Sequence, residues 1–266
     1  MRALVQEEYG EPRDVLGVGE VPDPVPGDDE VLIRVRAASI HIGDVHGIRG
    51  VPYLFRPIYG LRGPKARIPG TDIAGTVEAV GSSVTKCAPG DDVIGWCKKA
   101  FAEHVVTSAD TLAQKPAGLS FEQAAALGVS AMVALQALRD HGNVQPGQRV
   151  LINGASGGVG TFAVQIAKAF EAEVTAVCSK RNFELVRSIG ADQLIDYTKE
   201  DFTQGEQRYD LILDNVGTRS LAETRRALGT DGRLLSNGAP VGGWTRPLGR
   251  ILRVLASSWV VRQQAR

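Results

Sequence analysis

The sequence predicts an α/β protein in which a small β-barrel precedes a doubly wound parallel sheet. Three observations support this fold class. Residues 1–118 hold short strands separated by frequent Gly and Pro, which is typical of a small barrel. From residue 119 on, apolar strands alternate with helical segments, as they do in parallel sheets with helices on both faces. A glycine-rich turn at residues 154–160 joins one of these strands to a helix. We therefore predict two domains, 1–118 and 119–266.

The strands of the first domain follow from alternation and turn signals. Residues 31–37 read Val-Leu-Ile-Arg-Val-Arg-Ala, and this alternation of apolar and polar residues indicates a half-buried strand. Residues 73–81 repeat the pattern. Pro-Gly-Asp-Asp at 89–92 predicts a turn before a short strand over 93–95.

The second domain begins with a helix. Ser120 and Gln123 form a capping box, which predicts a helix that extends to about Arg139. Asn182 is expected to cap a later helix that Gly190 ends. Five strands are predicted, over residues 150–152, 173–178, 193–197, 209–213 and 233–236.

The glycine-rich turn carries the strongest functional signal. Its residues are Gly154, Ala155, Ser156, Gly157, Gly158, Val159 and Gly160. In a strand–turn–helix unit, one glycine makes the tight turn, another lets the backbone approach a pyrophosphate, and a third lets helix and strand pack closely. The free N–H groups of the helix N-terminus then bind the phosphates. We interpret this turn as a dinucleotide site; the alternative is a purely structural turn.

The end of the next strand distinguishes between cofactors. An NAD-selective site places an acid there to bind the ribose 2′-OH. This chain instead has Ser179, Lys180 and Arg181, and no carboxylate before Glu184. The two cations can pair with a 2′-phosphate, so NADPH is favoured over NADH. The alternative is that both are solvated residues at the start of a helix.

Composition excludes several classes of protein. The 266 residues carry 30 basic and 30 acidic side chains, and 43% are hydrophobic. These values exclude a disordered chain and argue against nucleic-acid binding through bulk positive charge. The three cysteines suggest no disulfide framework. No apolar stretch reaches the roughly 18 residues that span a bilayer. We expect a soluble, cytoplasmic protein with a small-molecule acceptor, no nucleic-acid partner and no membrane span.

Motifs along the chain resemble the medium-chain dehydrogenase/reductase superfamily, most of all its zinc-independent quinone oxidoreductase branch. The matching segments are residues 37–44 (Ala-Ala-Ser-Ile-His-Ile-Gly-Asp), 69–75 (Pro-Gly-Thr-Asp-Ile-Ala-Gly), 89–93, 101–103, 154–160 and 210–217. They occur in family order over nearly the whole chain. The resemblance implies a chaperonin-10-like barrel joined to a Rossmann domain that binds NADP.

The resemblance also implies roles for single residues. Ser130 is similar to the family's hydroxyl residue near the nicotinamide, and Tyr197 to an aromatic residue beside the 2′-phosphate. Further cofactor residues follow the fourth and fifth strands of the second domain. These are Asn215, Gly217, Gly238 and Ala239.

Zinc-dependent relatives have ligands that this chain lacks. They have a cysteine at the place of His41 and Gly-His-Glu at the place of Gly-Thr-Asp, residues 70–72. Catalytic zinc takes about three Cys, His or carboxylate ligands, and Thr71 is not one of them. We therefore predict no metal. A cluster of His41, Asp44 and His46 on one loop is the alternative.

The predicted reaction is hydride transfer from NADPH to a quinone or an α,β-unsaturated carbonyl. His41, Asp44 and Tyr53 are the candidate catalytic residues. His41 can protonate the reduced acceptor or can be a packed histidine without a proton role. Tyr53 belongs to an aromatic segment, with Phe55 and Tyr59, that either stacks on a flat substrate or packs in the barrel.

Two other functions stay open. The chain could bind NADPH with little or no catalysis, as a sensor or assembly partner, or be a zinc-type alcohol dehydrogenase. The family's Rossmann domain has six strands and this sequence shows five, so we expect a C-terminally incomplete domain. An unpaired edge strand, exposed apolar surface and loss of the usual homodimer are the expected consequences.

Overall fold

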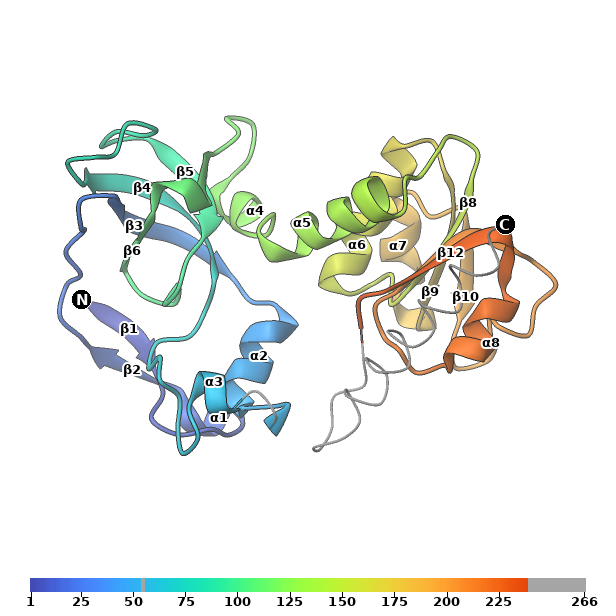
Figure 1. Cartoon of the computed structure of the whole chain (residues 1–266), viewed down its shortest axis with the longest axis horizontal. Coiled ribbons are helices and arrows are strands. Elements are labelled where there is room, and N and C mark those ends of the chain that lie inside the picture. The colour runs from blue at the N-terminus through green and yellow to red at the C-terminus, as the bar shows by residue number, and fades with distance from the viewer. Residues whose placement is uncertain (54–55, 239–266) are drawn as a thin grey trace. The chain divides into compact units, whose positions relative to one another are not determined.

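The structure is a computed structural model that describes residues 1–53 and 56–238. Internal contacts divide the chain into two compact units, Met1–Val129 and Ser130–Arg266. The domain boundary expected at residue 118 lies inside the first unit, just before helix α4 (Phe121–Ala125). The fold class predicted from the sequence is confirmed, with a five-stranded antiparallel sheet in the first unit and a five-stranded parallel sheet in the second (Figure 1).

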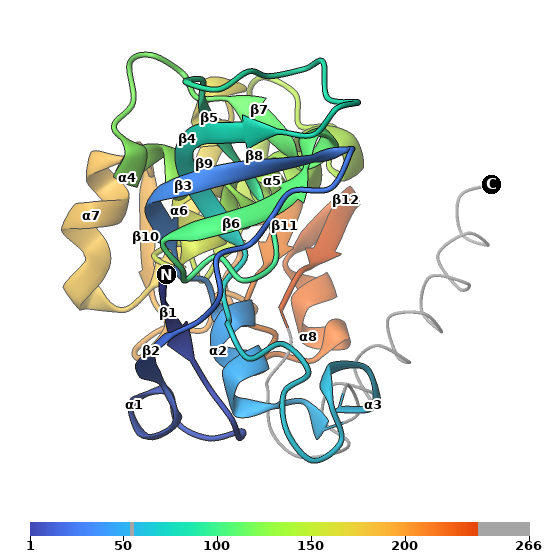
Figure 2. The ribbon, with the colours of Figure 1, turned by 90° about the vertical axis from the view of Figure 1, so that its left-hand side faces the viewer.

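The first unit is built around the antiparallel sheet. Its strands lie in the order β6-β3-β4-β5-β7 (Figure 2). Their bounds are β3 (Glu30–Ser39), β4 (Asp72–Val80), β5 (Asp92–Trp96), β6 (His104–Ser108) and β7 (Leu112–Gln114). Alternate residues Val31 and Ile33 of β3 are fully buried in its core, as the period-two pattern requires.

Shorter elements surround this sheet. They are β1 (Arg2–Val5), α1 (Pro12–Val15), β2 (Gly17–Glu20), α2 (Ile42–Arg49), α3 (Arg56–Tyr59) and the 3₁₀ turn η2 (Ala109–Thr111). Strands β1 and β2 pair with each other, and Ala3 forms a single bridge to Ala102. Helix α2 begins shortly after β3 ends, with His41 as its N-cap residue, so the residues that follow His41 start at the end of this interior strand.

The helix expected from Ser120 to Arg139 is interrupted. Its capping box is present, because Gln123 N–H donates to Ser120 Oγ and Ser120 N–H to Gln123 Oε1. However, α4 ends at Ala125, α5 covers Val129–Leu135, and a π-helix, η3, covers Gln136–His141. The reason is Asp72, whose Oδ2 accepts the N–H of Val129 at 3.0 Å in place of a helical carbonyl. The prediction of one continuous helix was wrong.

The second unit holds the parallel sheet in the order β10-β9-β8-β11-β12, which is the order of a Rossmann sheet through its fifth strand. The strands are β8 (Arg149–Asn153), β9 (Glu173–Cys178), β10 (Gln193–Asp196), β11 (Tyr209–Asp214) and β12 (Leu228–Ser236). The helices are α6 (Gly158–Ala169), α7 (Phe183–Ser188) and α8 (Leu221–Arg226), with the 3₁₀ turn η4 (Lys180–Asn182) before α7.

Both faces of this sheet are buried. Val150 and Ile152 pack against α5, α6 and α7, whereas Leu151 and Ile212 face the other way, with Ala227 and Phe202. Figure 1 shows α6 and α7 on one side of the strands and α8 on the other. A continuous apolar run in β8 therefore fits a strand that is covered twice.

Some predictions concern residues outside the described part of the chain. The missing sixth strand, the exposed apolar surface and Ala239 all involve residues 239–266, and Phe55 also lies outside the described residues. Within the described residues, β12 pairs on one side only, with β11.

Candidate functional site

The glycine-rich turn connects β8 to α6 as predicted. Gly154 has φ +78°, and its N–H and that of Ala155 both donate to the carbonyl of Val177 in β9. A Cβ on Gly160 would lie 2.1 Å from the carbonyl oxygen of Gly154. One on Gly158 would lie 2.9 Å from Ser130 Oγ. Positions 154 and 160 thus require glycine, and the turn lies against the hydroxyl of Ser130.

The N-terminus of α6 has the features of an anion site. This 12-residue helix begins after Gly157, which offers no side-chain acceptor to the first N–H groups. Unsatisfied N–H groups and the positive end of the helix dipole together favour phosphate. A backbone without Cβ atoms at positions 157, 158 and 160 leaves the approach open, so the turn fits the pyrophosphate of a dinucleotide.

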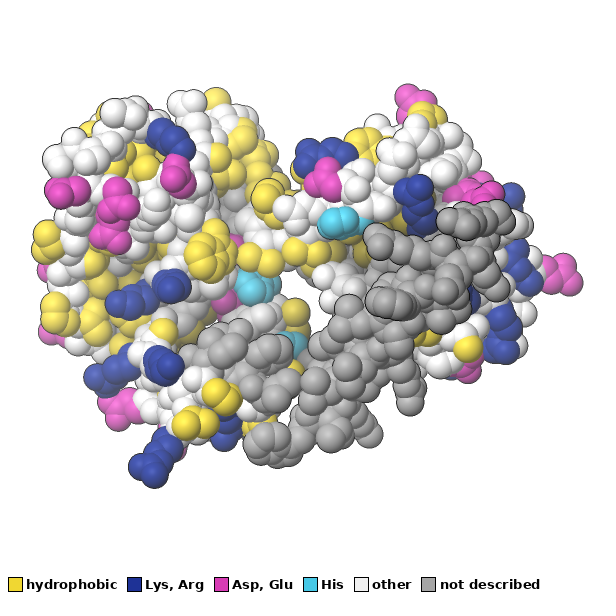
Figure 3. Space-filling model, viewed as in Figure 1, with side chains coloured by type: hydrophobic (Ala, Val, Ile, Leu, Met, Phe, Trp, Pro, Cys, Tyr) yellow, Lys and Arg dark blue, Asp and Glu magenta, His cyan; other side chains and the backbone are white. Residues whose placement is uncertain are grey.

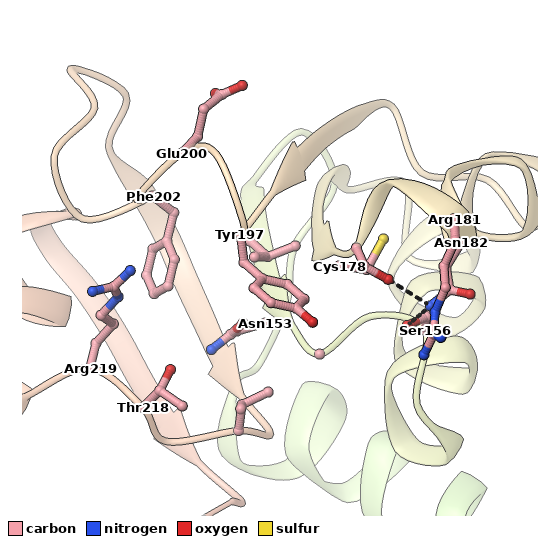
Figure 4. A pocket seen from close by; sticks show the side chains of 14 residues that line it. Asn153, Ser156, Cys178, Arg181, Asn182, Tyr197, Glu200, Phe202, Thr218 and Arg219 are labelled. Atoms are coloured by element: carbon pink, nitrogen blue, oxygen red, sulfur yellow. Dashed lines mark hydrogen bonds between the residues drawn. The ribbon is translucent and has the colours of Figure 1, made fainter.

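A cavity of about 430 Å³ opens beside this turn, at the carboxyl ends of β8, β9, β10 and β11 (Figure 4). This edge of the sheet is where open α/β sheets bind ligands. The lining residues are Asn153, Gly154, Ser156, Val177, Cys178, Ser179, Arg181, Asn182, Tyr197, Glu200, Phe202, Val216, Thr218 and Arg219.

Five of the predicted cofactor residues line this cavity: Gly154, Ser156, Ser179, Arg181 and Tyr197. Lys180 is next in the chain to two of them, but among the described residues it does not contribute to the wall. Of the two cations at the end of β9, it is therefore Arg181 that lines this cavity.

Asn182 has a different role from the one expected. It precedes α7, but its side chain makes no cap hydrogen bond to that helix. Instead, Asn182 Nδ2 donates to Ser156 Oγ at 2.9 Å and to Ser179 Oγ at 3.3 Å. It therefore ties the glycine-rich turn to the end of β9, and the two segments that line the cavity hold each other (Figure 4).

Asp214 organises the segment after β11 and was not singled out from the sequence. It is fully buried, and its Oδ1 accepts from Asn153 Nδ2 at 2.8 Å, Val216 N–H at 3.1 Å and Gly217 N–H at 2.8 Å. A charged acceptor shared by three donors stabilises this loop, because each such bond in the interior is stronger than a neutral one. The sequence feature that could have identified Asp214 is its place as the acidic residue at the end of the apolar strand β11.

Asn215 and Gly238 come together next to Asp214. Asn237 Nδ2 donates to Asn215 Oδ1 at 3.0 Å, and Gly238 N–H donates to the carbonyl of Asp214. A Cβ on Gly238 would lie 2.0 Å from the carbonyl oxygen of Asn215. The predicted residues after β11 and β12 thus form one structure at the same edge of the sheet.

In the first unit, His41 begins α2 as part of a second capping box. Its Nδ1 accepts the N–H of Gly43 at 2.9 Å, and its own N–H donates to Asp44 Oδ2 at 3.0 Å. Because Nδ1 is an acceptor, the neutral ring carries its proton on Nε2, which lies 2.7 Å from Thr71 Oγ1. Both ring nitrogens therefore have partners within the protein.

Two buried carboxylates lie beside this ring. Asp44 is near Thr71 Oγ1 and the His41 ring, and Asp72 receives hydrogen bonds from Val129 N–H and, at 3.4 Å, from Ser39 Oγ. Burial raises the pKa of Asp72 despite these donors and the nearby His41. Its other oxygen, Oδ1, is buried and has no hydrogen-bond partner among the described residues.

The thiol of Cys97 lies in the same neighbourhood. Burial, together with the charge of Asp72, raises its pKa to about 12. It is therefore a protonated thiol at neutral pH and neither a nucleophile nor a ready metal ligand.

These groups do not form a zinc site. A ligand histidine needs a free ring lone pair, but His41 uses Nδ1 for Gly43 and directs Nε2 at Thr71. His46 lies farther along α2, and burial, with Arg49 nearby, lowers its pKa. Among the described residues, no group of three His, Cys, Asp or Glu side chains is arranged to hold a metal ion. The donor set does not fit catalytic zinc, and a zinc-free reaction is part of the proposal below.

Tyr53, the third predicted catalytic residue, contacts Arg56. The guanidinium of Arg56 lies 4.5 Å from the centre of the Tyr53 ring and 4.8 Å from that of Tyr9. One face of Tyr53 is thus covered by a cation. The structure brings His41 and Asp44 together, and it places Tyr53 against Arg56.

Figure 3 shows how charged side chains are distributed over one face of each unit. Basic and acidic side chains are interspersed on the face of each unit seen in Figure 3, consistent with the zero net charge. Within residues 1–53 and 56–238, no helix is both long and apolar enough to cross a membrane.

Comparisons with known proteins agree with both halves of the fold. Residues 27–131 match the family model of the alcohol dehydrogenase GroES-like domain, and residues 158–259 match that of the zinc-binding dehydrogenase. The human protein "NAD(P)H oxidoreductase RTN4IP1, mitochondrial" is 39% identical over 236 residues, or 82% of this chain. The chain spans 60% of that relative's length.

Solved structures give the same assignment. The quinone oxidoreductase of Coxiella burnetii is 33% identical, with a TM-score of 0.81, over 89% of this chain and 75% of its own. That of Escherichia coli, solved in complex with NADPH, is 27% identical, with a TM-score of 0.79, over 89% of this chain and 72% of its own. The chain belongs to the medium-chain dehydrogenase/reductase superfamily, within its quinone oxidoreductase-like branch.

Proposed function

We propose that the chain is an NADPH-dependent oxidoreductase that transfers a hydride to a quinone or an α,β-unsaturated carbonyl without zinc. The observation that carries this proposal is the cavity beside the glycine-rich turn, which has a phosphate-binding helix end and Arg181 in one wall. The residues of the turn fit the cofactor, because glycine at 158 and 160 lets the turn, the helix and Ser130 pack closely, whereas a Cβ at either position would clash with its neighbours. When bound, the nicotinamide would supply the hydride.

Each wall of the cavity has a proposed task. The N–H groups of α6 would hold the pyrophosphate, and Ser179, Arg181 and Tyr197 would surround the ribose with its 2′-phosphate. Asn182 would keep these two walls at a fixed separation through Ser156. Ser130, whose hydroxyl is near Gly158, is proposed to lie close to the nicotinamide half. Asn215, Gly217 and Gly238 would line the same crevice.

His41 and Asp44 are proposed to shape the acceptor site. The His41 side chain is 16% exposed and Asp44 is buried, and the hydrogen bonds of the capping box fix the orientation of the imidazole ring. Protonating Nδ1 would require loss of the bond from Gly43, so we assign His41 a positioning role and let water supply the proton of the reduced acceptor. Tyr53 is proposed as an aromatic surface for a flat acceptor, with one face supported by Arg56.

The test is consumption of NADPH and NADH by the chain with a panel of quinones and enals, each compared with a reaction lacking the acceptor. The proposal expects turnover with at least one acceptor class and a preference for NADPH. Tight NADPH binding without turnover on any acceptor would instead favour the sensor or assembly function. The cytoplasmic location and the loss of the usual homodimer are still predictions.

A further inference from the structure

Helix α5 begins without a capping side chain of its own. The residue before it is Gly128, which has no side chain to accept the N–H groups of the first turn. A carboxyl from a distant strand does so instead, because Asp72, at the start of β4, accepts the N–H of Val129 at 3.0 Å. The first residue of α5 is therefore held by a side chain that lies 57 positions earlier in the chain.

The backbone at Gly128 lies directly against this carboxyl. A Cβ on Gly128 would lie 2.4 Å from Cγ of Asp72 and 2.5 Å and 2.7 Å from its two oxygens. The φ of Gly128 lies outside the left-handed region, so its backbone conformation does not itself require glycine. It is the carboxyl of Asp72 that requires a residue without a Cβ at position 128.

Capping alone does not account for Asp72. The residue is only 1% exposed, and its Oδ1 has no hydrogen-bond partner among the described residues. A buried acceptor without a partner destabilises the folded state, whereas a Ser or Asn at position 128 could cap α5 locally. The chain has the less stable of these two arrangements, which indicates that Asp72 has a task besides stability.

The residue after Val129 indicates this task. It is Ser130, which belongs to the first turn of α5. Its hydroxyl packs against the glycine-rich turn, where a Cβ on Gly158 would lie 2.9 Å from Ser130 Oγ. The hydrogen bond from Val129 to Asp72 therefore fixes the backbone one residue before the hydroxyl that contacts this turn.

We propose that Asp72 is a positioning residue for hydride transfer, which holds the N–H of Val129 and so fixes Ser130 in the first turn of α5. The inference rests on the proposed function, in which Ser130 lies close to the nicotinamide half of NADPH. A displacement of about 1 Å near the reacting groups can lower the rate of a bound reaction by up to about 10²-fold. The N–H groups of α6 do not contact Asp72, so its loss should lower kcat more than it lowers cofactor affinity.

The experiment compares variants of the carboxyl with a variant of the glycine. Asp72→Ala removes the acceptor, Asp72→Asn keeps one in its side-chain carbonyl oxygen, and Gly128→Ala adds the Cβ that displaces the carboxyl. Ser39→Ala is the matched control, because it removes only the longer hydrogen bond to the same carboxyl, at 3.4 Å. For each variant, kcat, the affinity for NADPH and the amide exchange rate of Val129 are measured well below its melting temperature.

D72A and G128A should each lower kcat by about tenfold or more, change NADPH affinity by less than about twofold and speed exchange at Val129 by about tenfold. D72N and S39A should match the wild type in all three measurements. Rescue by Asn separates positioning through the hydrogen bond from an effect of the charge. An unchanged kcat in D72A, equal losses of kcat in D72A and D72N, or a lower kcat without faster exchange at Val129 would each overturn the inference.

The double variant D72A/G128A tests how the two residues act together. The carboxyl that the new Cβ would meet is then absent, so kcat should equal that of D72A, whereas two independent losses would multiply and would contradict the inference. If D72A does not fold, the comparison of G128A with D72N and the wild type decides instead. If the wild type reduced no acceptor, the proposed function would fail, and exchange at Val129 would still decide whether Asp72 holds α5.

Discussion

Replacing Gly160 by Ala perturbs the glycine-rich turn at its tightest point. The new Cβ would lie 2.1 Å from Gly154 O and 2.7 Å from both the Cα and the carbonyl carbon of Ala155. All three atoms belong to the backbone, and Ala155 is fully buried, so no side chain can rotate away. Helix α6 and the turn must therefore separate by more than an ångström to reach ordinary van der Waals contact.

The cost follows from the packing of this region. Overfilling a close-packed site costs about 1–3 kcal/mol, which in a unit of this size lowers the melting temperature by roughly 3–10 °C. Because the displaced groups include the N–H donors of α6, we also expect NADPH affinity to fall by about tenfold or more. Thermal unfolding followed by circular dichroism and an NADPH titration measure the two effects.

Gly157→Ala is the matched control on the same turn. Gly157 has φ −82°, which alanine adopts readily, and a Cβ there would meet only Gly154 O, at 3.4 Å. The free energy of unfolding of G157A should therefore lie within about 1 kcal/mol of that of the wild type. If G160A were as stable as G157A and bound NADPH equally well, the close approach of helix and turn would not matter and the reasoning would be refuted.

Four other substitutions test three separate parts of the account. Burial raises the pKa of Asp72, so the folded state binds the carboxyl proton more tightly than the unfolded state does. The free energy of unfolding therefore falls as the pH rises from the ordinary pKa of 3.8 through the raised pKa. Asp72→Asn should thus melt above the wild type at neutral pH, with a gap that closes on acidification toward about pH 4; melting curves with a constant gap would contradict this. His41→Asn keeps a good helix cap, so, if His41 only positions its neighbours, kcat should fall by less than about tenfold and its pH profile should not change. Loss of a general acid would instead lower kcat by about 10²–10⁴-fold. Arg181→Gln should weaken NADPH binding about tenfold and leave NADH binding unchanged, and Lys180→Gln should change neither. Titrations of both cofactors measure these affinities. Equal losses of NADPH affinity in the two variants would mean that Lys180 shares the site.

Much of the fold could be predicted because its signals are local. The alternation in β3, the capping box at Ser120 and the apolar run of β8 each depend on neighbouring residues only. The glycine-rich turn was recognisable because a strand and a helix flank it at fixed spacing. Local motifs of this kind, the glycine-rich turn above all, also made the family recognisable from the sequence.

Other features depend on contacts between distant parts of the chain. The break before α5 arises because Asp72, 57 positions away, accepts the N–H of Val129. The side chain of Asn182 is drawn from its helix to Ser156, 26 positions away. Local propensity predicts neither feature. A helix that continues through Val129 and an Asn182 that caps α7 are both locally favourable, and only the distant partners decide otherwise.

The site was predicted in part for the same reason. Arg181 and Tyr197 follow the ends of strands, where parallel sheets place their ligands, and could be found by that rule. Asp214 and the cavity residue Arg219 have partners on other segments, Asn153 and Asp201, which no local pattern predicts. Lys180 and Arg181 look equivalent in the sequence, and only the course of η4 separates the one that lines the cavity from the one that does not.

The central claim is that the chain passes a hydride from NADPH to an electron-poor acceptor. The most direct measurement is a single turnover with NADPH deuterated at C4 of the nicotinamide and an α,β-unsaturated carbonyl, with the product analysed by mass spectrometry. The account predicts deuterium on the β-carbon of the reduced product, in proportion to the NADPH consumed. Bound NADPH that stays unoxidised with enal and quinone acceptors alike, or a reduced product without deuterium, would contradict it.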